Sequence, residues 1–166
     1  MQREPTMQEI RFDDVPALQA RIGEPFSPYG EAVEVTQQRI AQFADVTLDH
    51  QWIHLDVERA QRESPLRTTI AHGFLILSLL PALRQRPDLR IVGHGSVLNY
   101  GADKLRFLSP VPAGSRVRAR GRIVAVEPKA RGVLVSEEIE VAVVRADGGM
   151  SEKPALVYTM LLLYQP

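Results

Sequence analysis

The sequence predicts an α+β fold in which an antiparallel sheet wraps around a buried helix. Three observations lead to this prediction. Residues up to about 90 have the patterns of helices and loops, whereas the residues after them have the patterns of strands, and this division favours α+β over alternating α/β folds. The segment 71–84 is apolar on every side. The later segments alternate between apolar and polar residues, which is the period of a half-buried strand.

Length and composition indicate a single domain. We expect residues 1–166 to form this domain, with residues 1–24 as an N-terminal extension. The chain has no cysteine, which excludes a disulfide framework, a thiolate zinc site and a cysteine nucleophile. Its 20 basic residues balance 20 acidic ones, so we expect no binding to nucleic acid or to an anionic membrane. Residues 1–20 lack the apolar core of a secretory signal, and we expect a cytoplasmic protein.

The first half of the chain contains signals for short helices and one strand. Residues 31–35 alternate as a strand does. N-cap residues, whose side chains accept hydrogen bonds from the first free N–H groups of a helix, mark three helical segments. These are 13–21 with Asp13 or Asp14 as its cap, 37–44 after Thr36, and 57–63 after Asp56. Residues 45–55 show no helical period, so we expect a structured loop there.

The most apolar segment predicts a central helix. It begins near Ala71-His72-Gly73 and runs to about Arg84, and a helix of 12 residues would be about 18 Å long. Its apolar side chains cover every face, so we expect the helix to be buried all round. Pro81 removes one backbone hydrogen bond, and we expect a kink or an early end there.

The second half of the chain predicts the sheet around this helix. Its candidate strands are residues 91–100, 103–108, 115–127, 132–146 and 154–164. In the third strand the apolar residues share one face, and Arg116, Arg118, Arg120 and Arg122 share the other. A curled antiparallel sheet around a long helix is the hot-dog arrangement. Such a sheet leaves an edge strand and an apolar flank, and we therefore expect a homodimer.

Two short segments carry the functional signal. One reads Ala44-Asp45-Val46-Thr47-Leu48-Asp49-His50-Gln51-Trp52-Ile53-His54, and the other reads Thr69-Ile70-Ala71-His72-Gly73-Phe74. Together they resemble the MaoC-like dehydratase family, and more closely its (R)-specific enoyl-CoA hydratase branch, which includes nodulation-protein-N-like members. Residues 99–107 and 110–118 are also similar to that branch. The resemblance covers roughly residues 30–165.

The resemblance implies a catalytic pair, Asp49 and His54. Enzymes of this family add water across the trans-2 double bond of an enoyl thioester to give (R)-3-hydroxyacyl-CoA, and they need no metal or redox cofactor. The residue types suit this chemistry, because the attacking water loses a proton while C2 gains one, and a carboxylate and an imidazole beside one water can serve both steps. The spacing alone also fits a hydrogen bond that only stabilises the loop.

The second segment supplies the other part of the expected site. Negative charge builds on the thioester oxygen as C3 is attacked, and we expect the Gly73 N–H at the helix start to receive it. The candidate substrate contacts are Ile70, His72, Phe74, Trp52 and Asn99. Purely structural roles also fit three of them, which are His72, Trp52 and Asn99. The predicted ligand is an acyl-CoA thioester.

The first segment departs from the family pattern at two places. Leu48 stands where glycine is common in the family. A positive φ costs leucine more conformational energy than it costs glycine, so we expect the loop backbone to differ there. Gln51-Trp52 replaces a common Asn-Pro pair. Gln51 also stands where the zincin pattern needs a glutamate between His50 and His54, so we expect no metal site.

Other functions fit the same features. One is a hot-dog thioesterase, in which a carboxylate drives hydrolysis of the acyl thioester. Another is a non-catalytic acyl-binding subunit on the same fold, because fold alone does not fix function. The arginine row on residues 115–127 is typical of a solvated strand face, and the phosphates of CoA are its alternative partners.

Overall fold

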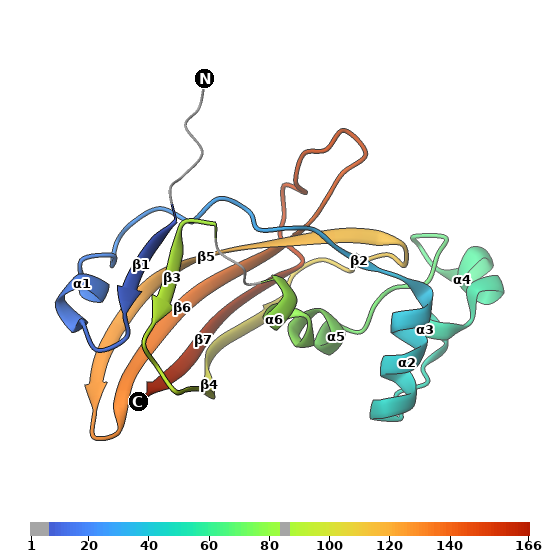
Figure 1. The fold of residues 1–166 in the computed structure, drawn as a ribbon. Helices are drawn as coiled ribbons and strands as arrows, with labels where there is room; N and C mark the ends of the chain where they lie inside the picture. Colours follow the sequence, from blue (N-terminus) through green and yellow to red (C-terminus); the bar gives the residue numbers. More distant parts are fainter. Residues whose placement is uncertain (1–6, 84–86) are drawn as a thin grey trace.

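The computed structural model describes residues 7–83 and 87–166, and its main element is a curved antiparallel sheet (Figure 1). Five strands form this sheet in the order β2 (Val33–Val35), β5 (Ser115–Lys129), β6 (Gly132–Val143), β7 (Leu156–Gln165) and β4 (Ser96–Phe107). Figure 1 shows the sheet arching over two short helices, α5 (Gly73–Ser78) and α6 (Leu80–Leu83). α5 packs against β7, and α6 packs against β5. The predicted hot-dog arrangement is therefore confirmed.

The central helix is broken, and it is not buried on every side. The separation of α5 from α6 agrees with the predicted kink, because Pro81 has no N–H to continue the helical hydrogen bonds. Leu75 and Ile76 are buried, but Phe74 is 60% exposed. The prediction of burial all round is wrong because the side of α5 that carries Phe74 borders an open cavity. The predicted helix end near Arg84 lies outside the described residues.

Three helices of the first half begin where the sequence predicts. They are α1 (Val15–Gln19), α2 (Gln37–Thr47) and α4 (Val57–Glu63). The side chains of Asp14, Thr36 and Asp56 accept hydrogen bonds from the N–H groups three residues later, at 3.1, 3.2 and 2.9 Å respectively. Each cap satisfies a donor that no intrahelical carbonyl reaches.

The chain between the starts of α2 and α4 is more helical than predicted. α2 extends to Thr47, and α3 (Trp52–Leu55) adds a further turn, so the prediction of a loop over residues 45–55 is wrong outside residues 48–51. Val46 and Leu48 are exposed, and a helical segment without a buried face has no apolar period to reveal it. None of the helices in the described ranges has the length and apolar character that crossing a membrane requires.

The strands agree with the sequence except at β4. The predicted strands 91–100 and 103–108 are instead β3 (Leu89–Val92) and the single strand β4, whose pairing with β7 shifts register twice between Asn99 and Lys104. β3 pairs in parallel with β1 (Gln8–Arg11) as a separate two-stranded sheet.

The described part of the predicted N-terminal extension belongs to the same core as the large sheet. Ile10, Phe12 and Leu18 are buried in the hydrophobic cluster that also contains the inward residues of β5, Val117 and Ile123. α1 packs directly against β5. The segment therefore helps to close one end of the sheet, while the helices α2 to α5 lie toward the other end (Figure 1).

Candidate active site

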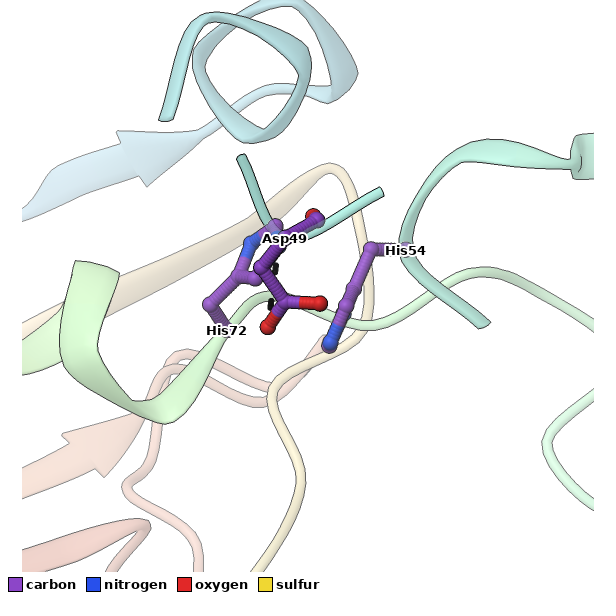
Figure 2. A group of neighbouring side chains, drawn as sticks. All are labelled: Asp49, His54 and His72. Atoms are coloured by element: carbon purple, nitrogen blue, oxygen red, sulfur yellow. Dashed lines mark hydrogen bonds and ion pairs between the residues drawn. The ribbon is translucent and has the colours of Figure 1, made fainter. Parts of the chain in front are cut away.

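His54 lies on α3, and its ring reaches toward the Asp49 carboxylate (Figure 2). The residue is 7% exposed, and its Nδ1 atom lies 2.7 Å from the carbonyl oxygen of Ile70. A carbonyl oxygen only accepts hydrogen bonds, so Nδ1 carries a proton and donates. The neutral ring therefore has its free lone pair on Nε2.

Three further hydrogen bonds hold the backbone around His54 in place. The Gln37 side-chain amide, from α2, donates to the His54 carbonyl oxygen at 2.8 Å. The Thr69 hydroxyl donates to the amide oxygen of Gln37 at 2.5 Å, and the Ile70 N–H donates to the Ile53 carbonyl oxygen at 3.0 Å. These bonds join α2, α3 and the segment before α5, so the two functional segments of the sequence meet at His54.

The environment of His54 favours its neutral form. Burial lowers the pKa of His54 below the ordinary value of 6.5, because a charged ring would lose its hydration. The Ile70 carbonyl and the Asp49 carboxylate oppose this shift, and the neighbouring His72 adds to it. Since the pKa is lowered overall, His54 is neutral at pH 7, and its Nε2 can accept a proton.

Asp49 reaches the site from the end of α2. Leu48 adopts the left-handed backbone conformation there, with φ 61° and ψ 21°, which glycine adopts most easily. Leu48 thus adopts a glycine-like turn in spite of its side chain, at a strain of about 1–2 kcal/mol. The Asp49 side chain is 57% exposed and accepts a long 3.4 Å hydrogen bond from the Gln51 N–H. Its carboxylate thus has capacity to bind a water.

Asp49, His54 and His72 form one group, whose carboxylate oxygen and ring nitrogen atoms lie within 4.8 Å of one another. The two imidazoles stack with centroids 3.7 Å apart and planes 26° apart. Their in-plane lone pairs therefore do not converge on a common point at the metal–nitrogen distance of about 2.0–2.1 Å. His50 points elsewhere, with Nε2 3.1 Å from Asp45. The group is better suited to acid–base chemistry on a shared water than to holding a metal ion.

A cavity of about 400 Å³ lies against His54 and the start of α5. Gly73 is the first residue of α5, so its N–H has no intrahelical acceptor. A Cβ at position 73 would lie 2.8 Å from Cδ1 of Phe107, which is closer than real side chains approach. The cavity lining is mainly apolar and includes two predicted substrate contacts, Ile70 and Phe74. The other lining residues are Ala71, Ile76, Leu108, Ser109, Pro110, Val111 and Ala155.

The other predicted substrate contacts lie outside this cavity lining. The His72 side chain is 4% exposed and lies behind His54. Trp52 packs under the Arg59 guanidinium, whose central carbon is 4.2 Å from the ring centroid. Asn99 lines a second cavity of about 590 Å³, which lies between the α5–α6 pair and strands β4 and β7. The structure thus brings His72 to Asp49 and His54, but it places Trp52 and Asn99 elsewhere.

Two residues that were not predicted as site residues also shape the site. Phe107, at the end of β4, lines the cavity directly beside Gly73. Gln37 lies 17 positions before His54 and fixes its carbonyl group. No local pattern in the sequence identifies a hydrogen-bond partner at such a separation.

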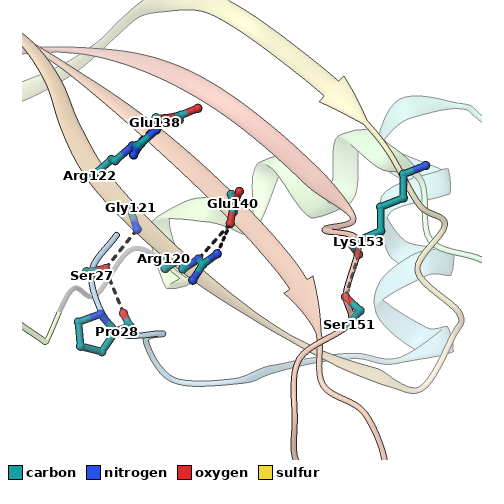
Figure 3. A network of polar contacts seen from close by, with 9 residues as sticks. All are labelled: Ser27, Pro28, Arg120, Gly121, Arg122, Glu138, Glu140, Ser151 and Lys153. Carbon is teal, nitrogen blue, oxygen red and sulfur yellow. Dashed lines mark hydrogen bonds and ion pairs between the residues drawn. The ribbon is translucent and has the colours of Figure 1, made fainter. Parts of the chain in front are cut away.

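Two of the four arginines in the row on β5 form ion pairs with glutamates of β6 (Figure 3). Arg120 forms an ion pair with Glu140 at 2.7 Å, and Arg122 forms one with Glu138 at 2.5 Å. Both guanidinium groups also lie over the Phe26 ring, at 4.8 and 4.5 Å from its centroid. Because these charges are already neutralised by neighbours, the geometry does not favour them as ligands for the phosphates of CoA.

Comparison with known proteins identifies the family. The profile described as MaoC like domain matches residues 18–144, which is more than half of the chain. The chain belongs to the MaoC-like dehydratase family. As a member it is a hydro-lyase, an enzyme that adds water to a double bond or removes it.

Individual relatives agree in sequence and in fold. The 3-hydroxyacyl-thioester dehydratase Z of Mycobacterium tuberculosis is 44% identical over 156 residues, covering 92% of this chain and 97% of that protein. Nodulation protein N of Rhizobium leguminosarum bv. viciae is 48% identical over 126 residues, covering 76% and 74%. The solved (R)-hydratase from A. caviae has a TM-score of 0.63 at 19% identity, covering 86% of this chain and 98% of that one, and this likeness shows the shared hot-dog fold.

Proposed function

We propose that this chain hydrates a trans-2-enoyl-CoA to the (R)-3-hydroxyacyl-CoA and also catalyses the reverse dehydration. The observation that carries the proposal is the approach of Asp49 to His54, with donor and acceptor atoms within 4.8 Å, beside a mainly apolar cavity. A relative named 3-hydroxyacyl-thioester dehydratase and a structural neighbour named (R)-hydratase support this class of reaction.

Neutral His54 is the base in the proposed mechanism. A water held between Asp49 and His54 attacks C3, so that a C–O bond forms while the π electrons of the C2–C3 bond move toward the thioester oxygen. Nε2 of His54 takes one proton from this water. The same nitrogen then returns the proton to C2, so hydrogen and hydroxyl add to one face of the double bond and His54 becomes neutral again. Asp49 accepts a hydrogen bond from the second proton of the water and stabilises the transient imidazolium.

The start of α5 is the proposed site for the thioester. The Gly73 N–H has no intrahelical acceptor and lines the same cavity as His54. We assign it as a donor to the thioester oxygen, where one such donor is typically worth about 10²–10³ in rate. Ile70 and Phe74 would contact the substrate from the same cavity wall. Asn99 would contact it only where the acyl chain extends into the second cavity.

We also propose that two copies of the chain pair through β4. β4 is the last strand in the sheet order, and its outer edge has no partner strand among the described residues. This edge is 12 residues long, and its exposed apolar residues are Val97, Leu98, Tyr100 and Phe107. A long apolar edge is a template for pairing with another strand, and antiparallel pairing of two β4 strands satisfies the twofold symmetry of a dimer.

The oligomeric state tests this pairing. At micromolar concentration, sedimentation equilibrium should give twice the 18.5 kDa mass of the chain. Leu98→Lys should yield monomers, because it places a charge on the paired edge. The matched change Val124→Lys, at an exposed position of β5, should leave the dimer intact. A monomeric wild-type chain would contradict the proposal.

The proposed reaction is tested by assaying the purified chain with crotonyl-CoA and with longer trans-2-enoyl-CoA substrates. We expect hydration, with the (R)-3-hydroxyacyl product identified by chiral analysis. Release of free thiol from saturated acyl-CoA, without hydration, would show a thioesterase instead. Binding of enoyl-CoA with no turnover at any chain length would show an acyl-binding subunit.

A further inference from the structure

We infer that His72 is a positioning residue for the proposed hydration, and that it fixes the backbone of Asp49 and the ring plane of His54 at the same time. The inference rests on the proposed function, because it concerns how the Asp49–His54 pair is held. It gives His72 a role through the other two residues instead of a contact with substrate.

The contact with Asp49 is made through the main chain. Nε2 of His72 lies 3.0 Å from the carbonyl oxygen of Asp49 and 3.9 Å from its carboxylate oxygen Oδ2. A carbonyl oxygen only accepts, so the ring donates from a protonated Nε2. The Asp49 side chain is 57% exposed, and within residues 7–83 and 87–166 it accepts one long hydrogen bond, from the Gln51 N–H. The hydrogen bond from His72 is therefore shorter than the one from Gln51, and it holds the main chain of Asp49 in place.

The other ring nitrogen shows that His72 is held in one neutral form. Nδ1 of His72 is buried and has no hydrogen-bond partner in the described part of the chain. A proton on Nδ1 would leave a buried N–H unsatisfied, whereas a bare lone pair is tolerated more easily. The titratable groups in contact with the ring are His54 from α3 and Asp49 from the loop after α2. His72 therefore donates from Nε2 to the Asp49 carbonyl oxygen.

The faces of the ring explain how His72 also orients His54. One contact is the stacked His54 ring, with centroids 3.7 Å apart. Another is Phe43 of α2, with its centroid 5.2 Å away and its plane tilted by 54°. Because His72 is also the residue before α5 and its own carbonyl accepts from Leu75 at 3.0 Å, the ring is tied to the same backbone turn that presents Gly73. His72 thus links the positions of the base, the carboxylate and the N–H donor.

Two variants separate the hydrogen bond from the filling of space. His72→Gln can place an amide N–H near the position of Nε2, while His72→Phe keeps an aromatic ring but has no donor. A displacement of about 1 Å in a catalytic group can cost about 100-fold in rate. We therefore expect His72→Phe to lower kcat by about 10- to 100-fold with KM within about threefold, and His72→Gln to recover most of that loss. Wild-type kcat in His72→Phe, or equal losses in both variants, would overturn the inference.

A spectroscopic measurement on the wild-type chain tests the same inference without turnover. The ¹⁵N shifts of His72 should show a protonated Nε2 and an unprotonated Nδ1. The opposite tautomer would overturn it. Absence of enoyl-CoA hydration by the wild-type chain would instead contradict the proposed function, so the two failures are distinguishable.

Discussion

Replacing Gly73 by alanine tests two properties of this residue: the lack of space for a side chain at the start of α5, and the proposed catalytic role of its N–H. The new Cβ would lie 2.8 and 2.9 Å from Cδ1 and Cε1 of Phe107, so the Phe107 ring has to move. This ring is 45% exposed and can turn outward, but it then loses its edge contact with Phe74 at 5.6 Å. We expect a loss of about 1–3 kcal/mol in the free energy of unfolding, which is typical of overpacking, and a fall in melting temperature of about 2–4 °C for each kcal/mol.

The same substitution should reduce turnover more than stability. Alanine keeps the N–H that we assign to the thioester oxygen, but its methyl group stands beside this N–H and hinders the close approach of the oxygen, so we expect a loss of up to the roughly 10²–10³ in kcat that one such donor is typically worth. Initial rates of crotonyl-CoA hydration measure this change, and thermal melts measure the stability. In a Phe107→Ala background the collision is absent, so Gly73→Ala should cost no further stability there, while the rate should stay low. Wild-type kcat in Gly73→Ala would refute the assignment of this N–H.

Two further predictions concern His54 and its support. The pKa of His54 is lower in the folded chain than the ordinary 6.5, so its contribution to stability is present above the unfolded value and is lost as pH falls through the folded one. Urea melts from about pH 5 to 8 should show this loss of stability in the wild type and not in His54→Gln. The value of kcat/KM should also fall as the pH is lowered, because a protonated His54 ring cannot accept a proton from water. Gln37→Leu should lower the free energy of unfolding by about 1–3 kcal/mol, because it leaves the buried Thr69 hydroxyl and the His54 carbonyl without their hydrogen-bond partner. Thr69→Val should lower it by about 1 kcal/mol. Denaturant melts of both variants test the order of these effects, and equal stability of Gln37→Leu and wild type would contradict it.

The sequence predicts the fold best where burial imposes a period or a helix start needs a cap. The strand that became β5 alternates because Val117 and Ile123 face the core, and Thr36 and Asp56 are visible as caps because their side chains satisfy free N–H groups. The C-terminal turn of α2 could not be predicted in this way. Its residue Val46 is 83% exposed, so no buried face leaves a pattern in the sequence.

The candidate site was predictable only as two separate motifs. His54 follows Asp49 by five positions, and the short helix α3, which carries His54, brings both side chains to one place. The stacking of His54 on His72 depends on the packing of α3 against the segment before α5, and no local spacing encodes it. Asn99 lies in a segment that is similar to the family, and the structure places it in the second cavity, away from His54.

Turnover by Asp49→Asn and His54→Gln tests the central claim most directly. Both changes keep the size of the side chain closely and remove its ability to exchange a proton at neutral pH. With trans-2-enoyl-CoA as substrate, each variant should lose about 10²–10⁴ in kcat while its circular dichroism spectrum stays that of the wild type. If both variants retain wild-type kcat, the carboxylate and the imidazole do not activate the water, and the proposed mechanism is contradicted.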